Sequence, residues 1–162
     1  MKHLILILAF LFASTFTFAS EIVKSEAYEN GQLKYKIEAF NENTEFLYYV
    51  YTAYYESGNL KETGEYNQFL RKSGHWNFYH ENGELEHHGF YSNGLRHGTH
   101  TILNEEGKTI VEANYRYGKK HSIFKTYDPS GNFLIAQRVY RNNKLRERFE
   151  WKEDEGLLIV NL

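Results

Sequence analysis

The chain has 162 residues, of which 41% are hydrophobic and 25% are charged, and its 19 basic and 21 acidic side chains give a formal net charge of -2. This balance leaves no excess positive charge for holding phosphate backbones, so we expect no nucleic-acid partner. The sequence has no cysteine, which excludes disulfides, zinc–cysteine sites, iron–sulfur clusters and a cysteine nucleophile. An aromatic content of 17% is its unusual feature.

The first predicted element is a secretory signal peptide, residues 1–19. A basic start precedes an apolar run from Leu4 to Phe12, and small residues lead to a cleavage point after Ala19. The run is shorter than the ~20 residues that span a bilayer, so we expect no integral membrane span after cleavage; a retained anchor is the weaker alternative. The mature protein would be a single domain, residues 20–162, in the periplasm or secreted.

The mature chain repeats with a period of 24 or 25 residues. Short polar turns such as Glu81-Asn82-Gly83-Glu84 recur, and we expect their glycines to adopt positive φ, which a residue without Cβ does at no steric cost. The residues that mark the repeat are Gly58, Gly64, Tyr66, Gly74, Tyr79, Gly83, Gly89, Tyr91, Gly98, Gly107, Tyr115, Tyr127 and Gly131.

Short segments rich in β-branched and aromatic residues lie between the turns and are typical of antiparallel strands. Because one hairpin cannot bury enough surface, we expect an all-β domain of repeated antiparallel hairpins stacked into an elongated twisted sheet or solenoid, with one face largely wet. Its open edges would also allow end-to-end dimers. The expected strands are residues 22–28, 33–40, 46–56, 60–67, 75–79, 85–91, 99–103, 109–115, 123–127, 133–140, 146–152 and a capping strand at 157–161.

Small residues recur inside the strands as well. Gly64, Gly89 and Ala113 fall at equivalent strand positions. A missing or minimal side chain there would let an aromatic ring of a neighbouring strand lie over the backbone. We therefore predict that Gly89→Leu strongly destabilises the domain.

The unit Tyr-x-x-x-Gly-x-Leu-x-x-x-Gly-x-Tyr, present at residues 54–66 and 79–91, resembles the bacterial variant of the MORN repeat. The joins at 74–79 and 94–99 are similar to the loop-and-strand segment of that family, and a similarity to YwqK-type antitoxin-module proteins covers about residues 28–152. The resemblance implies a non-catalytic array of hairpins, without cofactor, for protein–protein or membrane-proximal contacts. Together with the signal peptide, it implies an exported immunity-like protein.

Motifs for catalysis or metal binding are missing. Strand alternation sends His87 and His88 to opposite faces, and no His-Glu-x-x-His motif is present. His100 takes the place of Trp76 and Phe124 in the neighbouring repeats, so we expect it to be a packed or half-exposed substitute for an aromatic residue. No Gly-x-Ser-x-Gly elbow, phosphate loop or dinucleotide fingerprint occurs. We expect neither enzymatic activity nor a bound metal or cofactor.

Aromatic residues are the candidate binding surface. We expect about two thirds of the recurring tyrosines to pack between hairpins and the surplus to be exposed. The segment 46–55 carries aromatics on both faces, which suits a protein-binding surface, although a central strand covered on both faces has the same pattern. The basic run 138–148 is either a solvated rim or a contact for an acidic partner or lipid headgroups. The candidate binding residues are Tyr48, Tyr49, Tyr51, Tyr54, Tyr55 and Trp76.

The function we expect is that of a protein-binding scaffold or an immunity-like protein whose partner is another protein. The alternative is an aromatic-faced module that binds a carbohydrate or the peptidoglycan of the envelope. The two classes differ in what they retain from an envelope extract. A scaffold holds a protein, whereas a glycan module holds a saccharide and protects Trp76 or Trp151 from quenching.

Overall fold

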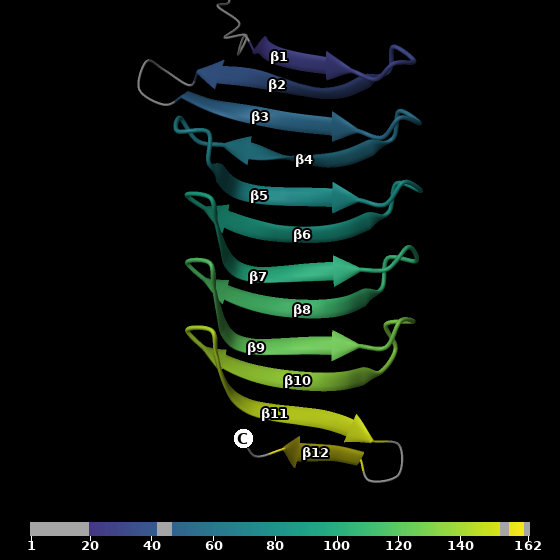
Figure 1. The fold of residues 1–162 in the computed structure, drawn as a ribbon, viewed down its shortest axis with the longest axis vertical. Helices are drawn as coiled ribbons and strands as arrows, with labels where there is room; N and C mark the ends of the chain where they lie inside the picture. Colours follow the sequence, from purple (N-terminus) through teal and green to yellow (C-terminus); the bar gives the residue numbers. More distant parts are fainter. Residues whose placement is uncertain (1–19, 42–46, 153–155, 161–162) are drawn as a thin grey trace, which may run out of the picture.

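The computed structural model describes residues 20–41, 47–152 and 156–160 (Figure 1). One sheet contains all twelve strands in chain order, each antiparallel to the next, so the predicted all-β fold of consecutive hairpins is confirmed. The predicted signal peptide, residues 1–19, lies outside the described residues. The strands are β1 (Glu21–Ala27), β2 (Leu33–Asn41), β3 (Leu47–Tyr54), β4 (Leu60–Tyr66), β5 (Lys72–Tyr79), β6 (Leu85–Ser92), β7 (Leu95–Leu103), β8 (Thr109–Arg116), β9 (Lys119–Tyr127), β10 (Leu134–Arg141), β11 (Lys144–Lys152) and β12 (Gly156–Val160).

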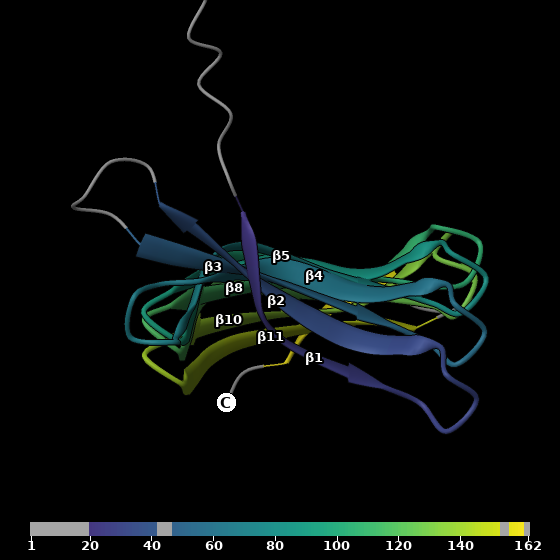
Figure 2. The same cartoon turned by 90° about the horizontal axis from the view of Figure 1, so that it is seen from above.

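The strands lie in one twisted layer, as the view from above shows (Figure 2). The sheet is open, and β1 and β12 are its two edges. Strands β7 and β9 start at Leu95 and Lys119, four residues earlier than expected. The expectation allowed a long loop before each of these strands, whereas the turn that precedes each of them is tight.

One kind of turn closes four of the described hairpins, from β1–β2 to β7–β8, on the right in Figure 1. In the turn that starts at His80, the His80 N–H donates to the Glu84 carbonyl at 2.8 Å, and the Gly83 N–H donates to the His80 carbonyl at 2.9 Å. The same pair of bonds recurs in the turns that start at Tyr28, Tyr55 and Asn104. The predicted positive φ is confirmed at the turn glycines Gly31, Gly58, Gly83, Gly107 and Gly131.

A second kind of turn links successive hairpins. Asn93 and Gly94 have φ of 56° and 86°, the two positive values of a type I′ turn, whose twist matches that of the flanking strands. The residue pairs 117–118 and 142–143 also have positive φ at both positions. Asn143 thus replaces the expected loop glycine, because asparagine enters the left-handed region more readily than most residues do.

One face of the sheet, called the aromatic face below, carries the core. The ring of Trp76 lies over Gly64 and the ring of His100 lies over Gly89, where an added Cβ would stand 2.2 Å from the ring in each case. Trp76 is 0% exposed and His100 is 2% exposed, so the predicted packing of rings over small residues is confirmed. The row across β3 to β9 reads Tyr51, Gly64, Trp76, Gly89, His100, Ala113 and Phe124.

Tyrosines flank this row of rings. The His100 ring lies between Tyr91 and Tyr115, with centroids 5.1 and 5.2 Å away in edge-to-face geometry. Phe124 has the same relation to Tyr115 and Tyr140, at 5.3 and 5.0 Å. Such pairs add about 0.5–1.5 kcal/mol each beyond the area that they bury. The ladder of rings therefore joins each hairpin to the next.

Polar residues prevail in the central row of the opposite face. Side chains in register across β3 to β9 there are half-buried, and none of them is a large apolar group. The expectation of a core face and a wetter face is confirmed for this row. Its members are Thr52, Thr63, Asn77, His88, Thr101, Glu112 and Lys125.

The first residue of a closing turn also bonds to the next repeat. The Tyr55 hydroxyl donates to the Tyr79 carbonyl at 2.6 Å, and His80 Nε2 lies 3.0 Å from the Leu103 carbonyl oxygen. These bonds add to the ring contacts at one end of the strands. They give His80 and Tyr55, the latter also a candidate binding residue, a role in joining the repeats.

Candidate functional site

Two of the six candidate binding residues are packing residues. The rings of Tyr51 and Trp76 stack with centroids 5.9 Å apart, and Trp76 Nε1–H donates to the Glu65 carbonyl at 3.0 Å. Burial raises the pKa of Tyr51 to about 12. The structure corrects the expectation for Trp76, because a ring with 0% exposure has no surface left for a partner.

The other four candidates keep part of their surface. Tyr48 stacks on Phe40 with centroids 5.3 Å apart, and the amine of Lys61 lies 5.3 Å from the centroid of the Tyr55 ring. Tyr49 and Tyr54 are half-buried, and within the described residues their rings make no aromatic contact. The alternative of a strand covered on both faces does not hold for the described sheet, because β3 has neighbours in the plane of the sheet and no second layer over it.

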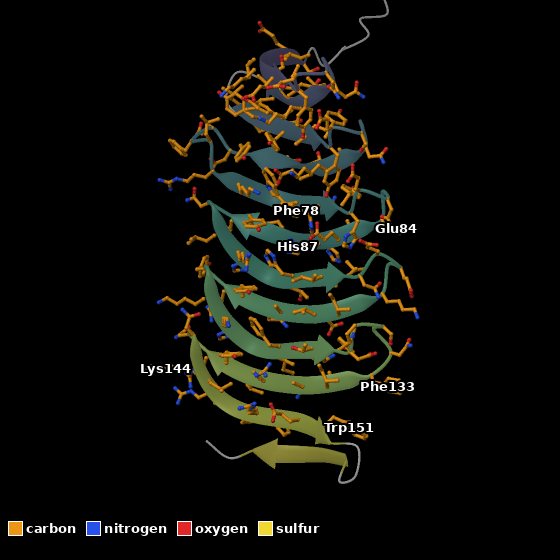
Figure 3. The ribbon with its side chains drawn as sticks, turned by 45° about the vertical axis from the view of Figure 1, so that its right-hand side comes forward. Phe78, Glu84, His87, Phe133, Lys144 and Trp151 are labelled. Atoms are coloured by element: carbon orange, nitrogen blue, oxygen red, sulfur yellow. The ribbon has the colours of Figure 1, made fainter. Side chains whose placement is uncertain are left out.

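A histidine pair lies near the middle of the aromatic face. His87 Nε2 is 3.1 Å from His100 Nδ1, and His100 Nε2 is 2.9 Å from the Phe90 carbonyl oxygen. Figure 3 shows His87 beside Phe78 on the neighbouring strand, and their stacked rings are 5.0 Å apart. Burial, with the other histidine as a second cause, lowers the pKa of His87 to about 4, and burial also lowers that of His100. Both rings are therefore neutral at pH 7.

We expect stability to fall as the pH drops from about 6.5 towards 4. The unfolded chain binds protons at ordinary histidine pKa values, about 6.5, whereas folded His87 resists protonation until the pH approaches 4 and the pKa of folded His100 is also lowered. This part of the stability is complete above pH 6.5 and is lost below it. Thermal unfolding of the wild type and of His100→Phe, measured from pH 7.5 to 4.5, checks the expectation.

The His100→Phe variant should lose less of its melting temperature over that range, because it has one buried histidine fewer to protonate. Phe124 shows that a phenylalanine fits this row. His75→Gln is the matched control, since His75 is exposed at the surface. A variant at position 100 with the same pH dependence as the wild type would contradict the role of the pair.

An apolar patch lies towards the β12 edge of the sheet, at β10 and β11. Phe133, Ile135 and Trp151 are 69%, 43% and 53% exposed, and they line a hollow of about 480 Å³ together with Asp128. Figure 3 shows Phe133 and Trp151 near one another at the right-hand ends of the strands. The sequence reasoning did not group these residues, because Phe133 and Trp151 lie in different hairpins.

Two further features concern metals and membranes. Across the described ranges, no group of three or more His, Cys, Asp or Glu side chains could hold a metal ion. The same part of the chain contains no helix that is long and apolar enough to cross a membrane.

Comparison with known proteins finds one repeat family that matches strands β3 to β6. Residues 50–68 and 72–93, about a quarter of the chain, match the MORN repeat variant family. They cover most of β3, all of β4 and the hairpin of β5 and β6. A search of curated proteins found no match, and nothing in the comparisons supports the antitoxin-module resemblance. Residues 50–68 and 72–93 are therefore similar to MORN repeat variants, and the same hairpin geometry continues in the strands on either side.

Proposed function

We propose that this protein is an exported, non-catalytic repeat scaffold that binds another protein through the tyrosines of β3. One observation carries the proposal. The sheet is a single layer, so Tyr48 on one face and Tyr49 on the other both keep exposed surface on the same strand. The MORN repeat match supports the scaffold role.

Tyrosine suits this task because its large ring has few rotatable bonds, so ordering it on binding costs little entropy. Tyr54 and Tyr55 lie where β3 meets its closing turn, and the Tyr55 hydroxyl is already held by the Tyr79 carbonyl. A partner would therefore meet rings that are positioned before it arrives. An ordered surface of this kind gains affinity by reducing the entropy lost on binding.

The export part of the proposal rests on the signal-peptide pattern of residues 1–19. An immunity-like role is one form of the scaffold function, in which the bound protein is harmful and is met in the envelope. That form rests on the family resemblance of the sequence alone.

A second candidate is a module that binds envelope glycan. It is favoured by the exposed rings of Phe133 and Trp151 beside Asp128, since apolar ring faces next to a polar group suit a sugar. Trp76 cannot report on such binding because it is fully buried, so only Trp151 fluorescence would respond.

We expect residues 20–162, used as bait for an envelope extract, to capture one protein in stoichiometric amount. The variant Tyr49→Ser with Tyr54→Ser should lose that capture, because it removes two half-exposed rings and spares the packing rings of Tyr51 and Trp76. Tyr117→Asn is the matched control: Tyr117 is 61% exposed at a distant turn and has φ of 49°, which asparagine tolerates. Captured protein is then purified and titrated against each bait.

Loss of binding in the double variant alone would support the scaffold function. Equal binding by all three baits would place the interface away from β3 and contradict the proposal. Retention of glycan without protein, with a change in Trp151 fluorescence, would favour the second candidate.

A further inference from the structure

Three cations occupy equivalent positions on the aromatic face. Lys72, Arg96 and Lys120 lie 24 residues apart and pair in register with Tyr66, Tyr91 and Tyr115. They belong to β5, β7 and β9, so two strand spacings separate each from the next. Neighbouring strands are ~4.8 Å apart, which puts successive members of this cation row about 9.6 Å apart.

Each residue of the cation row accepts a backbone hydrogen bond that fixes its position. The carbonyls of Lys72 and Arg96 accept from the N–H groups of Gly94 and Gly118, each at 2.8 Å, and that of Lys120 accepts from Asn143 at 2.9 Å. In every case the donor lies in the turn that links the next hairpin. The spacing of the row is therefore built into the stacking of the repeats.

Aromatic rings support the side chains of the cation row. The Lys72 amine lies 3.6 Å from the centroid of a Trp76 ring. Arg96 lies 5.2 Å from the Tyr115 ring and donates to its hydroxyl at 3.1 Å, and the Lys120 amine lies 5.1 Å from the Tyr140 ring. Cation–π contacts of this kind orient a charge without neutralising it.

Two of the three charges have no acidic partner. Lys72 pairs with Glu62 at 3.6 Å, whereas Arg96 and Lys120 form no ion pair with any described residue. A hollow of about 270 Å³ lies between Arg96 and Lys120, and Ala113 also lines it. Among the described residues, Glu86 is the one carboxylate that borders the hollow. A ligand that carries negative charge would complete this arrangement.

The spacing of the row selects among acidic peptides. Side chains on one face of an extended strand recur every two residues, or about 6.7 Å, and those seven residues apart on a helix recur at about 10.5 Å. Polyproline II has three residues per turn and a rise of 3.1 Å, so every third side chain recurs at about 9.3 Å on one face. Over two intervals, the polyproline II spacing differs from the spacing of the cation row by less than about 1 Å, whereas the helix spacing differs from it by about 2 Å.

We infer that Lys72, Arg96 and Lys120 form a docking row for an acidic polyproline II segment of the partner protein, with a carboxylate at every third residue. The inference deepens the proposed protein-binding function and rests on it. A neutral sugar is disfavoured here, because Trp76 and Tyr91 in the same place are 0% and 8% exposed and leave no ring face for stacking. Polyproline II also enters with little loss of entropy, since it is already ordered.

The test uses two synthetic peptides with the same composition, four Glu-Pro-Pro repeats and a permuted peptide whose four glutamates are adjacent. Their affinity for residues 20–162 is measured by calorimetry at low salt, where screening is weak. We expect the regular peptide to bind about tenfold more tightly than the clustered one. Arg96→Gln with Lys120→Gln should abolish the difference, and Arg116→Gln with Lys119→Gln, the same charge change at exposed positions, should retain it.

Equal affinity for the two peptides would mean that only net charge matters and would overturn the inference. So would tighter binding of polygalacturonate than of the regular peptide, which would assign the row to an acidic glycan. A failure here is distinguishable from a failure of the proposed function. The capture experiment depends on Tyr49 and Tyr54, whereas the peptide titration depends on Arg96 and Lys120.

Discussion

Gly89→Leu is expected to lower the free energy of unfolding by about 3 kcal/mol or more. A Cβ at this position would stand 2.2 Å from His100 Nδ1, and the ring cannot move away because Tyr91 and Tyr115 enclose it. His100 would have to leave its place and give up its contact with the Phe90 carbonyl. Chemical denaturation followed by circular dichroism measures the loss.

Gly98→Ser is the matched control, because it also removes a glycine from this region. Gly98 has φ of 69° and nothing within 4 Å of an added Cβ, and Ser122 holds φ of 62° at the equivalent place one repeat later. We expect it to cost less than about 1 kcal/mol. If Gly89→Leu were no more costly than this control, the ring over the glycine would not be a structural requirement.

Periodicity was enough to predict the fold. Each of the twelve expected strands has a counterpart, and the equivalence of Gly64 and Gly89 predicted where rings would cover the backbone. Both results follow from local rules: strand alternation sets which side chains share a face, and a residue without Cβ leaves room above itself. Repeats extend such rules along the chain, because each hairpin meets the same neighbours.

Burial of individual rings could not be predicted in the same way. Tyr51 and Tyr54 lie on one strand in the same pattern of aromatics, yet Tyr51 stacks on Trp76 and Tyr54 makes no ring contact among the described residues. The difference depends on which strands stand beside β3 and on the direction of each side chain. Trp76 was expected among the binding residues, but its neighbours close over it and leave it 0% exposed.

The cation row was not predicted from the sequence, for a different reason. The basic residues of the sequence draw attention to the run at 138–148, whereas Lys72, Arg96 and Lys120 are single residues in separate hairpins. Only register brings them into one line, because each pairs with a tyrosine of the neighbouring strand. A charge pattern at the period of the repeat was the signal that could have found them.

Trp76→Ala is expected to lower the free energy of unfolding by about 3–5 kcal/mol, the cost of emptying a fully buried aromatic site. The ring contacts Tyr51, Tyr66 and Tyr91, and the Glu65 carbonyl would lose its hydrogen bond from Nε1. Because each hairpin is stabilised by its neighbours, a gap here should separate the strands before β5 from those after it. Hydrogen exchange should show protection falling first in β4 to β6.

Trp76→Phe is the control, because Phe124 fills the equivalent site two repeats later and keeps edge-to-face contacts with two tyrosines. We expect it to retain a single unfolding transition and to cost less than half as much as the alanine variant. Equal losses for the two variants would assign the stability to the indole hydrogen bond. A loss below 1 kcal/mol for alanine would mean that the ring ladder does not couple the hairpins, which would then have to depend on backbone pairing and turn contacts alone.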